Sequence, residues 1–267
     1  MTDKFEELLE QRHENAAGWK REGKKIVGYF CTYGLEEIMH AGGLRPVRVF
    51  GPGGPYKLSR EHIQPYYCQN CHGAVDEALK GNYSYLDGLV SPYTCEHYRA
   101  AYDSWRINLP LDYTRFIDMP SQTDLPQSEE FFVQELKNFC GSLESAFGVS
   151  ITDDSLCDSI KLHNRNRSLL KELYGYKAAA EPVVSGAEVF AAIMSSTVTP
   201  KEEHNLLLED KLEEVGQRKG PAGEGPRLMA IGTEMHDPDI VKAIEETGAR
   251  MVADELCTGS RLVWVNV

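Results

Sequence analysis

Hydrophobic and polar positions along the chain fall into blocks that predict strands and helices in turn. The apolar run at 25–30 suits a buried strand, and the paired glycines 42–43 close a short helix after it. The expected strands of this first part are 25–30, 46–50, 86–90 and 114–117, and its helices are 35–40, 70–80 and 96–109. Such alternation predicts an α/β fold, in which a parallel sheet of the Rossmann or flavodoxin type carries helices on both faces.

The segments on either side of this block show helical periodicity without predicted strands. An amphipathic helix over 3–22 predicts an N-terminal arm (1–24), which precedes the α/β domain at 25–128. Only helical periodicity follows in 129–218, with helices expected at 129–147, 154–174, 186–194 and 200–217. We interpret this region as a helical connector.

A glycine- and proline-rich linker is expected at 219–226, where a domain boundary belongs. Beyond it, a strand at 227–232, a helix at 239–247 and a strand at 249–253 predict another βαβ unit. A parallel sheet needs more than two strands to bury both of its faces. Residues 227–267 are therefore expected to be the start of a second α/β domain that is cut short.

Charge and composition narrow the function. The chain has 28 Lys and Arg against 41 Asp and Glu, a formal net charge of -13, which argues against binding to nucleic acid or to an anionic membrane. No apolar stretch approaches the roughly 20 residues that cross a bilayer. The acidic, amphipathic start lacks the features of a secretory signal, so a cytoplasmic protein is expected.

Seven cysteines in such a chain are expected to be free thiols rather than a disulfide framework. Three of them, Cys68, Cys95 and Cys257, stand after predicted strands or before predicted helices. Parallel sheets bind ligands at this edge, and a helix N-terminus favours the thiolate that binds metal. The three could converge on an iron–sulfur cluster, whereas a single free cysteine is more often a small buried hydrophobic residue.

Other motifs give weaker indications. Cys68-Gln-Asn-Cys71-His72 has the C-x-x-C-H pattern of c-type haem attachment, and the same cysteines could hold zinc. Gly51–Gly54 favours a plain turn over a ligand loop. His163, His204 and His236 are expected at the surface or as caps. There is no P-loop motif, so the chain itself is not expected to bind a nucleotide.

Three stretches together resemble one family, the 2-hydroxyacyl-CoA dehydratases and benzoyl-CoA reductases, which are activated by ATP. They are 28–33 (GYFCTY) with 36–42 (EEIMHAG), then Cys68 with 86–95 (LDGLVSPYTC), and finally 252–261 (VADELCTGSR). The helical stretches 151–154 (ITDD), 164–167 (NRNR) and 202–205 (EEHN) are most similar to the benzoyl-CoA reductase branch. One departure is His72, where relatives often have arginine.

The resemblance implies a [4Fe-4S] cluster held by Cys68, Cys95 and Cys257 in a catalytic subunit that acts on a CoA thioester through ketyl radical chemistry. It also implies a homologous second subunit and an ATP-hydrolysing activator that is itself an iron–sulfur protein. Thr32 and Tyr33, at the end of the first strand, are expected to line the pocket and to donate a hydrogen bond or proton. The alternatives are a homodimeric reductase of small molecules with a double-cubane [8Fe-9S] cluster, and a non-catalytic scaffold or electron-transfer subunit.

Overall fold

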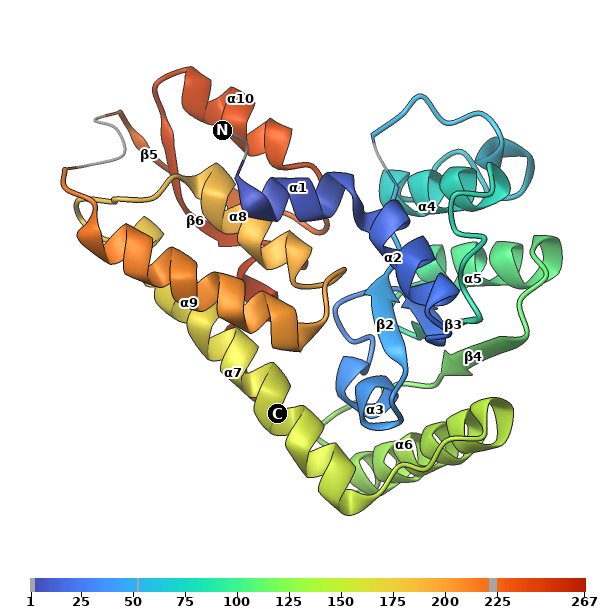
Figure 1. The fold of residues 1–267 in the computed structure, drawn as a ribbon. Helices are drawn as coiled ribbons and strands as arrows, with labels where there is room; N and C mark the ends of the chain where they lie inside the picture. Colours follow the sequence, from blue (N-terminus) through green and yellow to red (C-terminus); the bar gives the residue numbers. More distant parts are fainter. Residues whose placement is uncertain (1–2, 52, 221–224) are drawn as a thin grey trace. The chain divides into compact units, whose positions relative to one another are not determined.

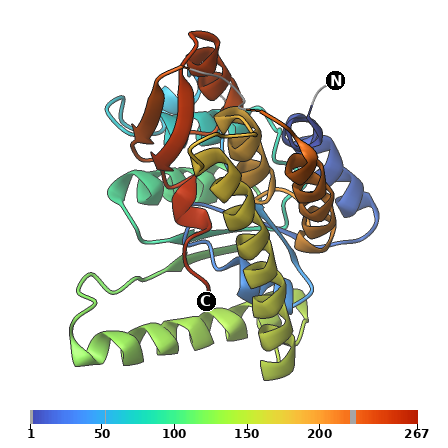
Figure 2. The ribbon, with the colours of Figure 1, turned by 90° about the vertical axis from the view of Figure 1, so that its left-hand side faces the viewer.

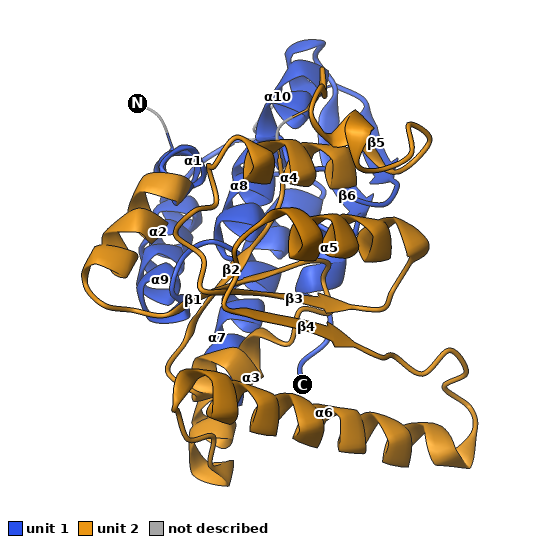
Figure 3. Cartoon of the chain, turned by 90° about the vertical axis from the view of Figure 1, so that its right-hand side faces the viewer, with its two compact units in different colours: residues 1–12, 160–267 blue, residues 13–159 orange. Residues whose placement is uncertain are grey.

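The computed structural model describes residues 3–51, 53–220 and 225–267, and it divides into two compact units. We call residues 13–159 the four-stranded unit, and residues 1–12 with 160–267 the two-stranded unit (Figure 3). The α/β fold expected from the sequence is confirmed. Residue 52 of the expected turn and residues 221–224 of the expected linker lie outside the described residues.

A parallel sheet in the order β2-β1-β3-β4 forms the four-stranded unit. Its strands are β1 (Ile26–Tyr29), β2 (Arg45–Arg48), β3 (Gly88–Pro92) and β4 (Tyr113–Ile117). Its helices are α2 (Arg12–Arg21), α3 (Glu36–Ala41), η1 (Ser59–Glu61), α4 (Gln69–Leu79), α5 (Glu96–Asn108) and α6 (Pro126–Phe147). The long helix α7 (Asp153–Ala178) begins in this unit and continues in the other.

Both faces of this sheet are covered, as Figure 3 shows, by α4 and α5 on one side and by α3 and α6 on the other. The alternation of side chains along a strand explains the two cores. Ile26 and Phe30 pack with residues of α4 and α5, whereas Val27 and Tyr29 pack with residues of α3 and α6. Because β1 is buried on both sides, it had to be an uninterrupted apolar run.

The two-stranded unit pairs β5 (Arg227–Ile231) with β6 (Arg250–Glu255) in parallel, the adjacent red arrows of Figure 2. Its helices are α1 (Lys4–Glu10), α8 (Gly186–Ser195), α9 (Lys201–Gln217), α10 (Pro238–Glu246) and η2 (Ser260–Leu262), together with most of α7 (Figure 1). Apart from Glu188, helix α8 consists of apolar and small residues, and all of these are buried. It is contacted by α1, α10 and β6 and forms the centre of this unit.

One sequence expectation needs correction. The single helix predicted over 3–22 is two helices, α1 and α2, which meet at Gln11. Gly51, at the start of the expected turn, has a packing role that the sequence did not indicate, because a Cβ atom there would lie 2.1 Å from the backbone of Gly73. The loop after β2 therefore packs directly on helix α4, and only glycine permits this approach.

Candidate functional site

Cys68 stands at the start of helix α4, at the carboxyl edge of the four-stranded sheet. It is the N-cap residue of this helix and is half-buried. Its backbone N–H donates to Nδ1 of His97, 3.1 Å away in the first turn of α5. His97 in turn stacks on Tyr67, with ring centroids 4.8 Å apart. The starts of α4 and α5 are thus joined through one histidine.

Cys95 occupies the same place on the neighbouring helix, as the exposed N-cap residue of α5. Partial burial of its sulfur raises the pKa of the Cys95 thiol, and the backbone N–H groups of Tyr98 and His97 lower it. Negative charge on Cys31 or Cys68 raises the pKa further. The net direction is upward, because burial outweighs the lowering of the pKa by the N–H groups at the start of the helix.

Cys31 is a third thiol at this edge, and sequence reasoning did not count it as a ligand. It lies two residues beyond the end of β1, is 7% exposed, and has a positive φ of 66°. The hydroxyl of Thr94 donates to its sulfur at 3.4 Å. Because parallel strands β1 and β3 are neighbours, the residues after them meet. The position of Cys31 immediately after a predicted strand was the signal that could have identified it.

The two residues after Cys31 project from the same loop. Thr32 is half-buried, and Tyr33 is 59% exposed rather than packed into the core. A phenol with this exposure can meet a bound molecule.

Cys257 belongs to the two-stranded unit and follows strand β6. Its backbone N–H donates to the carbonyl oxygen of Thr233 at 2.7 Å, and Arg261 Nη1 donates to its sulfur at 3.3 Å. The residue is half-buried. This cysteine precedes a short 3₁₀ turn and does not begin an α-helix.

The loop around Cys257 is organised by the buried carboxylate of Asp254. This carboxylate accepts hydrogen bonds from the backbone N–H of Ser260 at 2.7 Å and from Lys177 Nζ at 2.8 Å. The ion pair with Lys177 is almost completely shielded from solvent, with side-chain exposures of 1% and 0%. A Cβ atom at Gly259 would lie 2.1 Å from Asp254 Oδ1, so glycine is required for the loop to close around this carboxylate.

The C-x-x-C-H pattern has a structural explanation. Cys71 is fully buried in the core. His72 Nε2 donates to the carbonyl oxygen of Gln64 at 3.1 Å, and its Nδ1 accepts from the Ser59 hydroxyl at 3.0 Å. His72 thus holds the segment that leads into Cys68. Both residues are committed to packing and hydrogen bonding, which argues against haem attachment.

Three histidines expected at the surface or as caps have buried side chains. The exposed fractions are 2% for His163, 0% for His204 and 5% for the side chain of His236. His204 lies between Asn166 and Ser195, which resembles a nucleophile with its base.

The direction of the hydrogen bonds argues against that role for Ser195. His204 Nδ1 accepts from the Asn166 amide at 2.9 Å, so its Nε2 carries the proton and donates to Ser195 Oγ at 3.0 Å. The Ser195 hydroxyl then donates to the carbonyl oxygen of Ala192. His204 is thus a donor to this serine and not its base, and the network stabilises the buried packing of α7, α8 and α9.

Thiols are the donors that a soft metal or an iron–sulfur cluster prefers, so the chemistry of Cys68, Cys95 and Cys257 suits such a group. Two of them cap neighbouring helices, whose N-terminal N–H groups favour bound negative charge. Within the described ranges, however, no three His, Cys, Asp or Glu side chains are grouped closely enough to hold a single metal ion.

Comparison with known proteins decides the family. The family model of the 2-hydroxyglutaryl-CoA dehydratase D-component matches residues 31–267. The chain belongs to this family. The family resemblance noted in the sequence is thereby confirmed.

Curated relatives of this family member are subunits of reductases and dehydratases. It is 28% identical to a benzoyl-CoA reductase subunit of Thauera aromatica, over 90% of the chain and 64% of that relative. It is 24% identical to the beta subunit of (R)-2-hydroxyglutaryl-CoA dehydratase of Acidaminococcus fermentans, over 98% of the chain and 69% of that relative. The beta subunit of lactoyl-CoA dehydratase of Anaerotignum propionicum is 23% identical, over 99% of the chain and 72% of that relative. The chain spans about two thirds of the length of these relatives.

Among the described helices, none is both long enough and apolar enough to cross a membrane.

Proposed function

We propose that this family member is a cluster-binding catalytic subunit of a cytoplasmic, ATP-activated enzyme that reduces or dehydrates a CoA thioester. Family membership and the names of its relatives, which are subunits of benzoyl-CoA reductase and of 2-hydroxyacyl-CoA dehydratases, support this proposal. The proposed cofactor is one [4Fe-4S] cluster.

The proposed ligands are Cys68, Cys95 and Cys257. The observation that carries the proposal is the matched placement of Cys68 and Cys95, each capping a helix at one edge of the same parallel sheet. Two N–H groups at the start of α5 act on the sulfur of Cys95, so this helix would stabilise a negatively charged ligand there.

Other residues of the chain would orient the ligands and the substrate. Arg261, by donating to the sulfur of Cys257, would fix the direction of this side chain. Thr32 and Tyr33 would face the substrate from the loop after β1, where a hydroxyl can donate a hydrogen bond or a proton to a thioester oxygen. When bound, the cluster would supply single electrons of low potential to the thioester.

The proposal includes two protein partners. One is a homologous subunit, supported by the naming of the relatives as subunits. The other is an iron–sulfur activator that hydrolyses ATP, which agrees with the absence of a P-loop motif from the sequence of this chain.

The test is the iron content of anaerobically purified chain, measured for the parent and for four serine variants. We expect about four irons per chain and a brown charge-transfer absorption. Each of Cys68→Ser, Cys95→Ser and Cys257→Ser should lose most of the iron. The matched control is Cys157→Ser, an exposed cysteine on α7, which should keep the parent content.

An iron-free parent that retains its fold would refute the proposal. About eight irons per chain would replace it with the double-cubane alternative. Calorimetry with benzoyl-CoA and with a 2-hydroxyacyl-CoA, with and without the homologous subunit, tests the substrate class. Cluster binding without thioester binding in either case would indicate an electron-transfer or scaffold role.

A further inference from the structure

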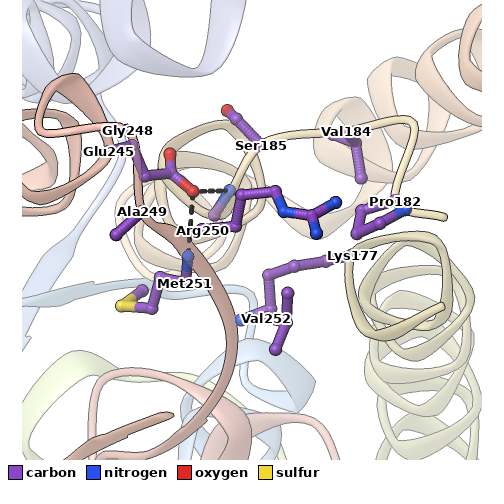
Figure 4. Close-up of a pocket in the computed structure, with 11 residues that line it drawn as sticks. Lys177, Pro182, Val184, Ser185, Glu245, Gly248, Ala249, Arg250, Met251 and Val252 are labelled. Carbon is purple, nitrogen blue, oxygen red and sulfur yellow. Dashed lines mark hydrogen bonds between the residues drawn. The ribbon is translucent and has the colours of Figure 1, made fainter. Parts of the chain in front are cut away.

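A second site lies in the two-stranded unit, and the residues that line it include none of the cysteines proposed as ligands. A pocket of about 180 Å³ opens between the end of α7, the start of α8 and the start of β6. Its apolar walls, drawn in Figure 4, are Pro182, Val184, Ala249, Met251 and Val252. A cavity of about 150 Å³ in another protein accepts benzene, so this pocket has room for a molecule of about six to eight heavy atoms.

The carboxylate that lines the pocket, Glu245, is already hydrogen-bonded to backbone groups of the chain. Glu245 accepts hydrogen bonds from the backbone N–H groups of Gly186 at 2.8 Å, of Ala187 at 3.1 Å and of Met251 at 3.2 Å. It therefore closes the N-terminus of α8, as the dashed lines in Figure 4 indicate in part. The start of α8 is thus occupied by a carboxylate of the chain itself, and Glu245 disfavours a ligand with two negative charges.

The two positively charged side chains of the pocket, Lys177 and Arg250, differ in how completely they are paired. Lys177 is paired with Asp254 at 2.8 Å and lies 3.9 Å from the ring centroid of Tyr174. Arg250 donates through Nε to the carbonyl oxygen of Gly225 at 3.2 Å, but its Nη1 is buried and has no hydrogen-bond partner among the described residues. In Figure 4 its guanidinium extends toward Pro182 and Lys177.

A buried donor without a partner costs the folded chain free energy, and a ligand oxygen placed against Arg250 Nη1 would recover this cost. An apolar body would fill the rest of the pocket. We infer that the pocket binds a small monocarboxylic acid, with its carboxylate on Arg250 and its hydrocarbon part against Val184, Ala249 and Val252. The inference uses none of the proposed cysteine ligands, so it stands or fails independently of the proposed function.

The probe is isovalerate, a branched monocarboxylate of suitable size, titrated into the full chain by calorimetry or by ligand-observed NMR. Its neutral isostere, isovaleramide, should bind about tenfold more weakly or worse, because a charge-assisted hydrogen bond is lost. Inorganic phosphate should not compete, because Glu245 and Asp254 repel a second charge.

Arg250→Met keeps most of the length of the side chain and removes its charge, and it should weaken isovalerate binding by about tenfold or more. The matched control is Arg165→Met, which removes an exposed arginine of the same unit and should leave binding unchanged. Arg250→Lys retains a positive charge without the guanidinium fork and gives a second measure, with an intermediate loss, should Arg250→Met fail to fold.

Equal binding of isovalerate by the parent, Arg250→Met and Arg250→Lys would overturn the inference. So would the absence of isovalerate binding to the parent, or displacement of isovalerate by phosphate at lower concentration.

Discussion

The three cysteines proposed as ligands stand in two surroundings that are built differently. Cys68 and Cys95 begin helices that pack on a sheet buried on both faces, so the apolar cores place them. Cys257 lies in a loop after a two-stranded sheet, and a buried ion pair places it through hydrogen bonds to the backbone. Hydrophobic packing therefore positions Cys68 and Cys95, whereas a buried ion pair positions Cys257, although all three follow strands.

The difference matters because an apolar core and a buried ion pair respond differently to substitution. An apolar core loses stability gradually as side-chain volume is removed. Removing one partner of a buried ion pair lowers the free energy of unfolding by a large amount in a single step, because the remaining buried charge has no compensation. Substitutions in the two places should therefore separate them.

The largest effect is expected at the ion pair. Lys177→Met should lower the free energy of unfolding by about 3–5 kcal/mol, because Asp254 would remain buried and charged. Urea denaturation monitored by circular dichroism measures this loss. The double variant Lys177→Met with Asp254→Asn removes both charges and should recover part of it. A loss below about 1 kcal/mol for the single variant would remove the contrast between the two surroundings.

A core substitution in the four-stranded unit comes next. Leu89 is fully buried in the centre of the sheet, and Leu89→Ala should cost about 3 kcal/mol through lost burial and the cavity left behind. The same denaturation experiment applies, with exposed Ile107→Ala as the control. If Leu89→Ala proved neutral, hydrophobic packing would not be what supports the Cys68 and Cys95 edge.

The third effect is a pH dependence confined to the two-stranded unit. Burial opposes ionisation of Glu188, but hydrogen bonds from Arg218, Ser185 and Lys211 prevail and lower its pKa to about 2 from 4.5. This depressed pKa means that the stabilising effect is complete above about pH 4.5 and is lost as the pH falls toward 2. The full difference corresponds to about 3 kcal/mol.

Glu188→Gln tests this pH dependence. The variant should be less stable than the parent at pH 7, and the gap should narrow as the pH falls below about 4.5. Urea midpoints compared between about pH 7 and about pH 3.5 give the measurement. A gap that stays constant over this range would show that the carboxylate charge is not the source of the stability.

The smallest effect concerns the link between α4 and α5. His97→Phe keeps a ring against Tyr67 but removes the acceptor for the Cys68 N–H, which should cost about 1 kcal/mol. The unfolding free energy and the protection of the Cys68 amide against hydrogen exchange should both fall. Unchanged amide protection would show that His97 does not fix the start of α4.

Local patterns in the sequence predicted most of the elements. The apolar run at 25–30 could be little other than a buried strand, and β1 occupies 26–29 within it. The predicted helix at 186–194 is observed as Gly186–Ser195, because Ser185 and Glu188 form a capping box that the local sequence alone dictates. The break at Gln11 was missed, since both α1 and α2 satisfy the same amphipathic period.

The site was less accessible to sequence reasoning. Cys68 and Cys95 were placed on helix starts because strand and helix boundaries are local features. Cys31 and His97 were not recognised as their neighbours, because contacts between distant segments depend on which strands and helices pack together. The burial of His204 was misjudged for the same reason, because Asn166, which donates to it, lies far from it along the chain.

The sequence by itself determined the order of strands and helices, the acidic character of the chain and the positions of its cysteines beside sheet edges. These follow from periodicity, capping and composition, which act over a few residues. Only the tertiary structure decided that Asp254 is paired with Lys177. It also decided that Arg250 has a buried donor without a partner among the described residues, and that His72 holds a loop through hydrogen bonds. Burial and long-range packing set the cost of each polar group, and neither can be read from neighbours in the sequence.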